Sequence, residues 1–164
     1  MVLSVGSNLG DRLAHLRSAA EGVRPFLVAA SAVYETDPWG PVEQPAYLNA
    51  VLIADAPEFD ARGWLARARA LEAAARRLRE QRWGPRTLDV DLVTVEGVTS
   101  DDPELILPHP RAHERAFVLV PWADADPDAV LPGRGPVRDL LDRLDSRDAS
   151  GVRRYLPAAD LVSP

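Results

Sequence analysis

The chain has 164 residues, of which 46% are hydrophobic and 27% are charged, a composition that predicts one globular domain and excludes a disordered or fibrous chain. Its formal net charge of −6 argues against a duplex-DNA-binding protein, because a surface that binds DNA is usually basic. The absence of cysteine excludes disulfides, thiolate catalysis and cysteine zinc sites.

The first part of the chain predicts three strands and one helix. Strands are expected over residues 2–6, 26–34 and 47–54. The helix begins after Asn8, which serves as its N-cap, and ends at Pro25. Because the segment 36–46 is polar and rich in proline, we expect it to form a long loop that joins the second and third strands as a hairpin.

The second part adds a long helix, a fourth strand and C-terminal elements. Apolar residues at spacings of three and four predict a helix over 58–82. A strand is expected over 87–95, a short strand-like run at 105–107, and helices near 111–125 and 136–144. The order β-α-β-β-α-β predicts a ferredoxin-like α+β fold, an antiparallel sheet with two helices packed on one face and extra C-terminal elements.

Several broad properties follow from the absence of particular signals. No segment approaches the roughly 18 consecutive apolar residues that a transmembrane helix needs. A strand-like run begins directly after Met1 and leaves no room for a signal peptide, so we expect a cytoplasmic protein. We also expect a monomer with a single domain over 1–164 that binds neither membranes nor nucleic acids. All 19 basic residues are Arg, which excludes lysine Schiff-base and P-loop mechanisms.

Two acidic residues on the expected fourth strand are the sharpest chemical feature. Side chains alternate along a strand, so Asp89 and Asp91 leave the same face with Cα atoms about 7 Å apart. Two carboxylates beside a buried face repel each other unless a cation lies between them. A magnesium ion bound by one or two carboxylates and by substrate phosphates meets this need. The alternatives are exposed acids on an edge strand, or acids paired with Arg from a neighbouring element.

Arginine residues before this strand indicate a phosphate site. Arg82, Trp83 and Arg86 flank the Gly84-Pro85 turn, and the guanidinium fork of Arg matches phosphate oxygens. The alternative is that Arg86 neutralises one of the two acids without any ligand.

A second basic cluster follows the fourth strand. His109 lies just before the expected helix 111–125 and Arg115 one to two turns inside it, which predicts an anion site at a helix N-terminus. His113 lies four residues after His109, a spacing that suits zinc, but no third ligand has a suitable spacing. A structural role for His113 is therefore favoured.

Two other polar sets leave alternatives open. The long helix carries Arg69, Glu72, Arg76 and Arg79, a pattern typical of a solvated helix face. The segment 36–49 carries Thr36, Trp39, Tyr47 and Asn49, which could bind a flat heterocycle or fill the core beneath the loop. The chain has no P-loop, GxSxG or HExxH motif.

Four segments taken together resemble the 6-hydroxymethyl-7,8-dihydropterin pyrophosphokinase family over residues 2–135. They are Val5-Gly6-Ser7-Asn8-Leu9-Gly10-Asp11, Tyr47-Leu48-Asn49-Ala50, Arg82-Trp83-Gly84-Pro85-Arg86-Thr87-Leu88-Asp89-Val90-Asp91-Leu92, and Pro108-His109-Pro110 with Arg115 and Phe117. The resemblance implies transfer of pyrophosphate from ATP to the hydroxymethyl group of 6-hydroxymethyl-7,8-dihydropterin, with release of AMP, in folate biosynthesis.

The resemblance also implies roles for particular residues. Magnesium is the implied cofactor and ATP the co-substrate, with Asp89 and Asp91 as ligands of two magnesium ions. The pterin positions are Thr36, Asp37, Trp39, Tyr47, Asn49, Trp83 and Phe117, with the ring stacked between Trp83 and Phe117. The ATP positions are Arg69, Glu72, Arg82, Arg86, Leu92, His109 and Arg115. The catalytic positions are Arg77, Arg79 and Arg86, where the match of the first two requires a one-residue gap before Arg82.

Two other functions are weighed against this one. A magnesium-dependent nucleotidyltransferase could use the same pair of acids and would release pyrophosphate instead of AMP. A ferredoxin-like regulatory module, with the acids paired to Arg, would bind its ligand in the presence of EDTA and would not turn over ATP.

Overall fold

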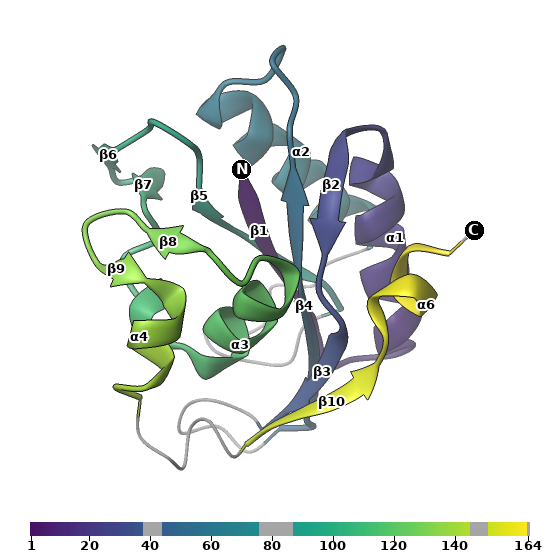
Figure 1. Cartoon of the computed structure of the whole chain (residues 1–164). Helices are drawn as coiled ribbons and strands as arrows, with labels where there is room; N and C mark the ends of the chain where they lie inside the picture. Colours follow the sequence, from purple (N-terminus) through teal and green to yellow (C-terminus); the bar gives the residue numbers. More distant parts are fainter. Residues whose placement is uncertain (38–43, 76–86, 145–150, 164) are drawn as a thin grey trace.

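An antiparallel sheet forms the centre of the protein in the computed structural model, which describes residues 1–37, 44–75, 87–144 and 151–163 (Figure 1). Its strand order within these residues is β10-β3-β4-β1-β5, and β2 also pairs with β4. The strands are β1 (Val2–Ser7), β2 (Leu27–Ala30), β3 (Val33–Thr36), β4 (Tyr47–Ala54), β5 (Asp89–Thr94) and β10 (Val152–Leu156). The order of β3, β4, β1 and β5 is that of a ferredoxin-like sheet, so the expected fold class is confirmed.

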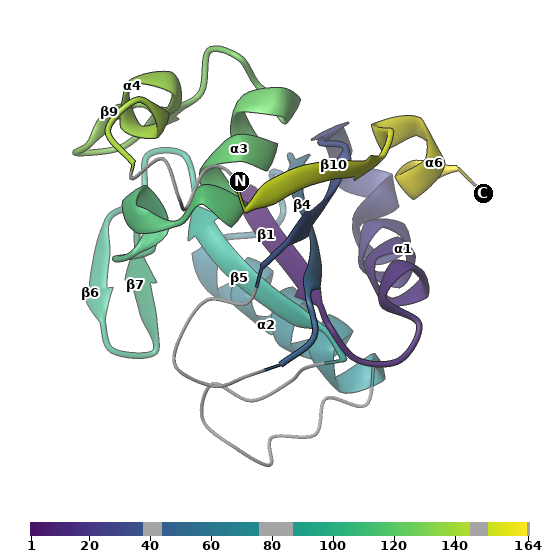
Figure 2. The ribbon, with the colours of Figure 1, turned by 90° about the horizontal axis from the view of Figure 1, so that it is seen from below.

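Helices cover both faces of this sheet, as Figure 2 shows. The helices α1 (Arg12–Val23) and α2 (Ala61–Ala74) pack on one face, which we call the helix-pair face. The helix α3 (Ala116–Ala125) packs on the other face, the α3 face, with α4 (Val137–Leu141) against it. The short C-terminal helix α6 (Ala158–Val162) lies beside α1.

The alternation of side chains along β5 divides the apolar core into two parts. Leu88, Val90 and Leu92 are buried on the helix-pair face, whereas Val93 is buried with residues of α3 on the α3 face. Because alternate residues share a face, Asp89 and Asp91 lie on the α3 face together with Val93.

Two expectations for the N-terminal half need correction. The N-cap of α1 is Asp11, not Asn8, because the Asp11 carboxylate accepts a hydrogen bond from the Ala14 amide at 3.0 Å. The expected strand 26–34 is divided into a 3₁₀ turn, η1 (Arg24–Phe26), and the strands β2 and β3. The break lies at Ser31, whose hydroxyl accepts from the Val51 amide at 2.9 Å and so supplies the β4 backbone with a side-chain partner.

The later helices also differ in their bounds. The helix expected over 58–82 begins at Ala61, because the Asp60 carboxylate caps it by accepting from the Gly63 amide at 2.7 Å, and its described part ends at Ala74. The helix expected near 111–125 is a 3₁₀ turn, η2 (Ala112–Glu114), followed by α3. Arg115 therefore lies at the N-cap of α3 and not one to two turns inside a helix.

Of the three pairs of elements that follow β5, only the strand β7 was expected, as the short run at 105–107. Two small hairpins follow β5, formed by β6 (Ser100–Asp102) with β7 (Leu105–Leu107), and by β8 (Val130–Leu131) with β9 (Gly135–Pro136). The C-terminal β10 and α6 close the described chain against β3 and α1. None of the described helices has the length and apolarity required to cross a bilayer.

The observed N-cap of α1 gives a first prediction. Replacement of Asp11 by Ala removes the side-chain acceptor and lowers the free energy of unfolding by about 1 kcal/mol, within a range of roughly 0.5–2 kcal/mol for such caps. Asp11→Asn keeps an acceptor and serves as the matched control, with urea denaturation followed by circular dichroism as the measurement. Equal stability of Asp11→Ala and the native chain would contradict this cap.

Candidate active site

The candidate site lies where five polar or glycine positions of neighbouring strands share the α3 face. Asn49 of β4 and Asp89 of β5 are both register partners of Gly6 of β1, and we call these three residues the central row. Thr36 of β3 is paired with Tyr47 of β4 at the next position along the sheet. Since directly opposed residues of an antiparallel sheet point to the same face, the strands bring these side chains together without any loop.

A glycine in the central row leaves space for the Asn49 side chain. A Cβ atom on Gly6 would lie 2.5 Å from Asn49 Oδ1, closer than real contacts allow. The Asn49 amide donates to Thr36 Oγ1 at 2.6 Å, and both side chains are buried. The pair forms a fixed polar wall beside the carboxylates, of the kind that orients the polar edge of a small ligand.

The carboxylate pair is partly neutralised by a cation from α3. Arg115 Nη1 donates to Asp91 Oδ2 at 3.0 Å, and the two side chains are 12% and 35% exposed. Burial raises the pKa of the Asp91 carboxyl and the neighbouring Asp89 carboxylate raises it further. Arg115 and the nearby His109 act in the opposite direction, because a positive charge favours the ionised carboxylate.

His109 is held at the edge of the same carboxylate. Its backbone amide donates to the Val93 carbonyl at 2.8 Å, and its Nδ1 accepts from the Arg111 amide at 3.2 Å. The neutral ring therefore carries its proton on Nε2, the nitrogen that lies 3.9 Å from Asp91 Oδ2. Burial lowers the pKa of the imidazole, with the Asp91 carboxylate acting against it.

Arg115 joins the carboxylates to an aromatic side chain. Its guanidinium carbon lies 5.5 Å from the centre of the Phe117 ring, within the distance of a cation–π contact. Its buried Nε has no hydrogen-bond partner among the described residues. An unpaired buried donor next to a carboxylate and an aromatic face can donate a hydrogen bond to an anionic ligand oxygen without losing an existing bond.

Four expected site residues lie elsewhere than on this face. Glu72, from α2, accepts a hydrogen bond from the Val90 amide at 3.0 Å. This amide lies on the outer edge of β5, the last strand in the described sheet, so the carboxylate gives it the partner that a further strand would supply. Leu92 has its side chain in the core of the helix-pair face. Arg69 is exposed and lies 3.9 Å from Glu104, so the interpretation of a solvated helix face holds for Arg69 but is wrong for the buried Glu72. Asp37 forms an exposed ion pair with Arg153 at 3.0 Å.

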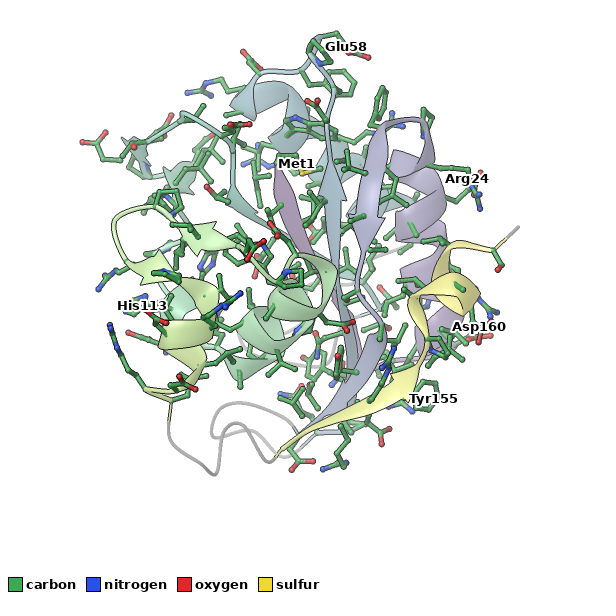
Figure 3. All side chains as sticks on the ribbon, viewed as in Figure 1. Met1, Arg24, Glu58, His113, Tyr155 and Asp160 are labelled. Atoms are coloured by element: carbon green, nitrogen blue, oxygen red, sulfur yellow. The ribbon has the colours of Figure 1, made fainter. Side chains whose placement is uncertain are left out.

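His113 is separate from the carboxylate pair. It lies 3.5 Å from Glu114 and lines a surface hollow that also includes Arg134 and Arg143, on the side of α4 (Figure 3). The structural role favoured by the sequence for His113 stays a prediction.

Six of the expected site residues fall outside the described residues, so their placement stays a prediction. They are Trp39, Arg77, Arg79, Arg82, Trp83 and Arg86. Because Arg86 is one of these residues, the alternative in which it neutralises one of the two acids also stays a prediction. The alternative in which a neighbouring element supplies the cation is realised for Asp91, because Arg115 comes from the start of α3.

Sequence reasoning missed the contacts of Asn8 and Gln44, which hold the segment before β4 in place. Asn8 Nδ2 donates to Gln44 Oε1 and to the Pro45 carbonyl, both at 3.1 Å. The Tyr47 hydroxyl donates to the same Gln44 oxygen at 3.2 Å. The sequence Gly6-Ser7-Asn8 predicts the start of a helix. Local spacing contains no signal that the Asn8 side chain binds Gln44, 36 residues further along the chain.

The donor set fits a hard cation that shares its coordination with a ligand. No group of three or more His, Asp or Glu side chains converges as a metal cage in the described ranges. Asp89 and Asp91 nevertheless offer two carboxylates on one face, and magnesium is commonly held by one or two carboxylates with water and substrate phosphates completing its shell. The residues present therefore fit magnesium with a phosphorylated ligand better than a cation held by protein alone.

Comparison with known proteins identifies a family model and relatives that match this chain. Residues 2–127 match the family model of 7,8-dihydro-6-hydroxymethylpterin-pyrophosphokinase, HPPK. A relative from Mycobacterium tuberculosis, named 2-amino-4-hydroxy-6-hydroxymethyldihydropteridine pyrophosphokinase, is 54% identical over 99% of this chain and 93% of its own length. A relative of the same name from Pseudomonas aeruginosa is 36% identical over 96% of each chain.

A solved structure shares the fold at much lower sequence identity. The HPPK-DHPS protein of Plasmodium falciparum superposes with a TM-score of 0.64 and 13% identity, covering 93% of this chain. This chain spans 46% of that protein's length, so the likeness concerns the fold of that part alone. On the strength of the family model and of the relatives from bacteria, the chain belongs to the 7,8-dihydro-6-hydroxymethylpterin-pyrophosphokinase family.

Proposed function

We propose that this chain transfers the pyrophosphoryl group of ATP to the hydroxymethyl group of 6-hydroxymethyl-7,8-dihydropterin, a step of folate biosynthesis. The hydroxymethyl oxygen forms a bond to the β-phosphorus, the bond between that phosphorus and the oxygen bridging to the α-phosphate breaks, AMP leaves, and the hydroxyl proton is released. The observation that carries the proposal is the central row, which sets the buried Asn49 amide and the Asp89 carboxylate on one face of the sheet, the face that Asp91 shares.

The pterin is assigned to the polar wall and the aromatic side chain beside it. A pterin ring has hydrogen-bonding edges and a flat apolar face, and it needs fixed polar partners and an aromatic surface. Asn49 and Thr36 supply fixed polar partners, and Phe117 supplies an aromatic face. Tyr47, Asp37, Trp39 and Trp83 complete the proposed set.

Magnesium is assigned to Asp89 and Asp91, with two ions proposed. When bound, magnesium would neutralise charge on the phosphates that react. The Arg115–Asp91 ion pair gives the half-buried Asp91 carboxylate a positive partner before substrates arrive. Arg115 and His109 are assigned to the phosphates, since both lie beside Asp91 and an arginine fork matches phosphate oxygens.

The remaining assignments follow family positions. The nucleotide contacts proposed are Arg69, Glu72, Arg82, Arg86 and Leu92, and the catalytic residues proposed are Arg77, Arg79 and Arg86. Leu92 would act through its backbone, because its side chain lies in the core. We further propose that the enzyme acts as a cytoplasmic monomer with a single domain over residues 1–164.

The reaction is tested by its products. Incubation of the purified chain with ATP, magnesium and 6-hydroxymethyl-7,8-dihydropterin yields AMP and the pyrophosphorylated pterin in equal amounts, and EDTA abolishes the turnover. Phosphorus NMR identifies both products. Release of pyrophosphate would instead indicate nucleotidyl transfer, and ligand binding without ATP turnover would indicate a regulatory module.

The carboxylate assignment is tested by Asp89→Ala. Loss of a principal charge stabiliser lowers kcat by at least ~10³-fold. Asp101→Ala, which removes an exposed carboxylate on β6, is the matched control and keeps native activity. AMP formation is measured alongside thermal unfolding, and a folded Asp89→Ala enzyme with near-native turnover would refute the assignment.

The central row is tested by Gly6→Ala. The new Cβ displaces the Asn49 amide, so pterin affinity falls by at least about 5-fold, the size expected for loss of one buried hydrogen bond. ATP affinity changes less than about 2-fold, because the Asp91 side is not displaced. Gly63→Ala is the matched control, since its Cβ would meet no atom closer than 3.4 Å. Equal pterin affinity of Gly6→Ala and native protein, measured by fluorescence titration, would contradict the role of this row.

A further inference from the structure

Arg12, the first residue of α1, bridges the two strands that carry the proposed pterin contacts. Its Nη1 donates to Glu35 Oε1 of β3 at 3.1 Å and to the Ala46 carbonyl, directly before β4, at 2.8 Å. The Arg12 and Glu35 side chains are 28% and 32% exposed, so the contact is partly shielded from water. None of the site assignments above includes Arg12.

The position of this bridge matters because the β3–β4 pairing is short. It consists of Tyr34 with Asn49, Glu35 with Leu48 and Thr36 with Tyr47. Arg12 therefore adds a side-chain link at the end of the ladder where Thr36 and Tyr47 lie. A link at the end of a short ladder limits fraying, which is greatest at the last pair.

Arg12 reaches the strands from the face opposite the candidate site. Glu35 is the register partner of Leu48, a core residue of the helix-pair face, whereas Thr36 and Tyr47 point to the α3 face. The guanidinium is therefore separated from the pterin position by the thickness of the sheet. An effect of Arg12 on the substrate must pass through the strand backbone.

A second contact, from Asn8 in the connection between β1 and α1, acts on the same segment. Asn8 holds the Gln44 side chain and the Pro45 carbonyl, and Arg12 holds the next carbonyl, that of Ala46. Three consecutive residues before β4 are thus held by contacts from Asn8, in the β1–α1 connection, and from Arg12. The geometry of Arg suits this task, because its rigid fork carries several donors, whereas the ammonium of Lys is a flexible point charge.

We propose that Arg12 is a positioning residue for pterin binding: from behind the sheet it fixes the spacing of β3 and β4 at Thr36 and Tyr47 without touching the substrate. The proposal rests on the proposed function, since it assigns Arg12 to the pterin half of that site. The proposal gives Arg12 no part in ATP binding. Asp89, Asp91 and Arg115, which are assigned to magnesium and the phosphates, lie on the other side of β1 from the contacts of Arg12.

The test compares Arg12→Met with Arg17→Met. Arg17 lies on the same helix and also donates to a backbone carbonyl, that of Asp160 in α6, so it is a matched loss of one arginine (Figure 3 labels Asp160). Arg12→Met raises the KM for the pterin about 10-fold, the factor that corresponds to about 1.4 kcal/mol, and changes the KM for ATP less than about 2-fold. Arg12→Lys recovers part of the loss.

A second readout follows the backbone directly. Hydrogen exchange in the native chain without substrates speeds up for the amides of residues 44–49 in Arg12→Met and stays unchanged there in Arg17→Met. If Arg12→Met fails to fold, Glu35→Gln gives the same pattern in weaker form, because an amide oxygen still accepts but carries no charge.

Several outcomes would overturn the proposal. They are an unchanged pterin KM in Arg12→Met, an equal rise in the KM of both substrates, an equal effect in Arg17→Met, or faster exchange without any loss of pterin affinity. Failure of the proposed function is distinguishable, because it appears in the native chain as absence of AMP formation. A native chain inactive on the pterin overturns both proposals together.

Discussion

Strands pleated with a period of two place Asn49, Gly6 and Asp89 in one row across the sheet, and the candidate site depends on that register. A shift of one residue in either ladder would turn the amide or the carboxylate toward the apolar helix-pair core. The apolar cores on the two faces of the sheet oppose such a shift. A shift would turn Leu88, Val90 and Leu92 out of the helix-pair core in which they are buried. The packing that stabilises the fold therefore also keeps the polar groups on a common face.

The repulsion between the two neighbouring carboxylates is reduced in this structure by the guanidinium of an arginine. Arg115 is placed by the start of α3 rather than by the interior of a helix, so its guanidinium reaches back over β5 to Asp91. An ion pair of this kind is costly to break by removing one partner, because a partly buried charge is then left without compensation, and a bound metal ion would supply the same compensation to Asp91 as the guanidinium does. The two interpretations that the sequence left open, acids paired with Arg and acids that bind a cation, are thus compatible in one site.

Much of the architecture could be predicted from local patterns, because periodicity reports which face of an element is buried. The strand over 47–54, the helix–strand order and the shared face of Asp89 and Asp91 follow from spacing alone. The N-cap at Asp11 and the break at Ser31 did not, since each depends on which of several similar residues meets a particular backbone group.

Long-range partners were beyond the reach of sequence reasoning. The bonds of Asn8 to Gln44, of Arg12 to Ala46 and of Glu72 to Val90 join segments that only the folded chain brings together. Apolar and polar periodicity gives the direction of a side chain but not the identity of its partner. The site could therefore be located on the correct strands, while the contacts that hold it in shape could not be predicted.

The placement of β10 has a consequence for self-association. By pairing with β3, it makes a site-bearing strand internal and becomes the outermost strand on that side of the described sheet. Unpaired edge strands recruit foreign strands, and short length and charged side chains discourage this. β10 has five residues and two consecutive arginines, Arg153 and Arg154, and both features discourage pairing with a strand of another chain.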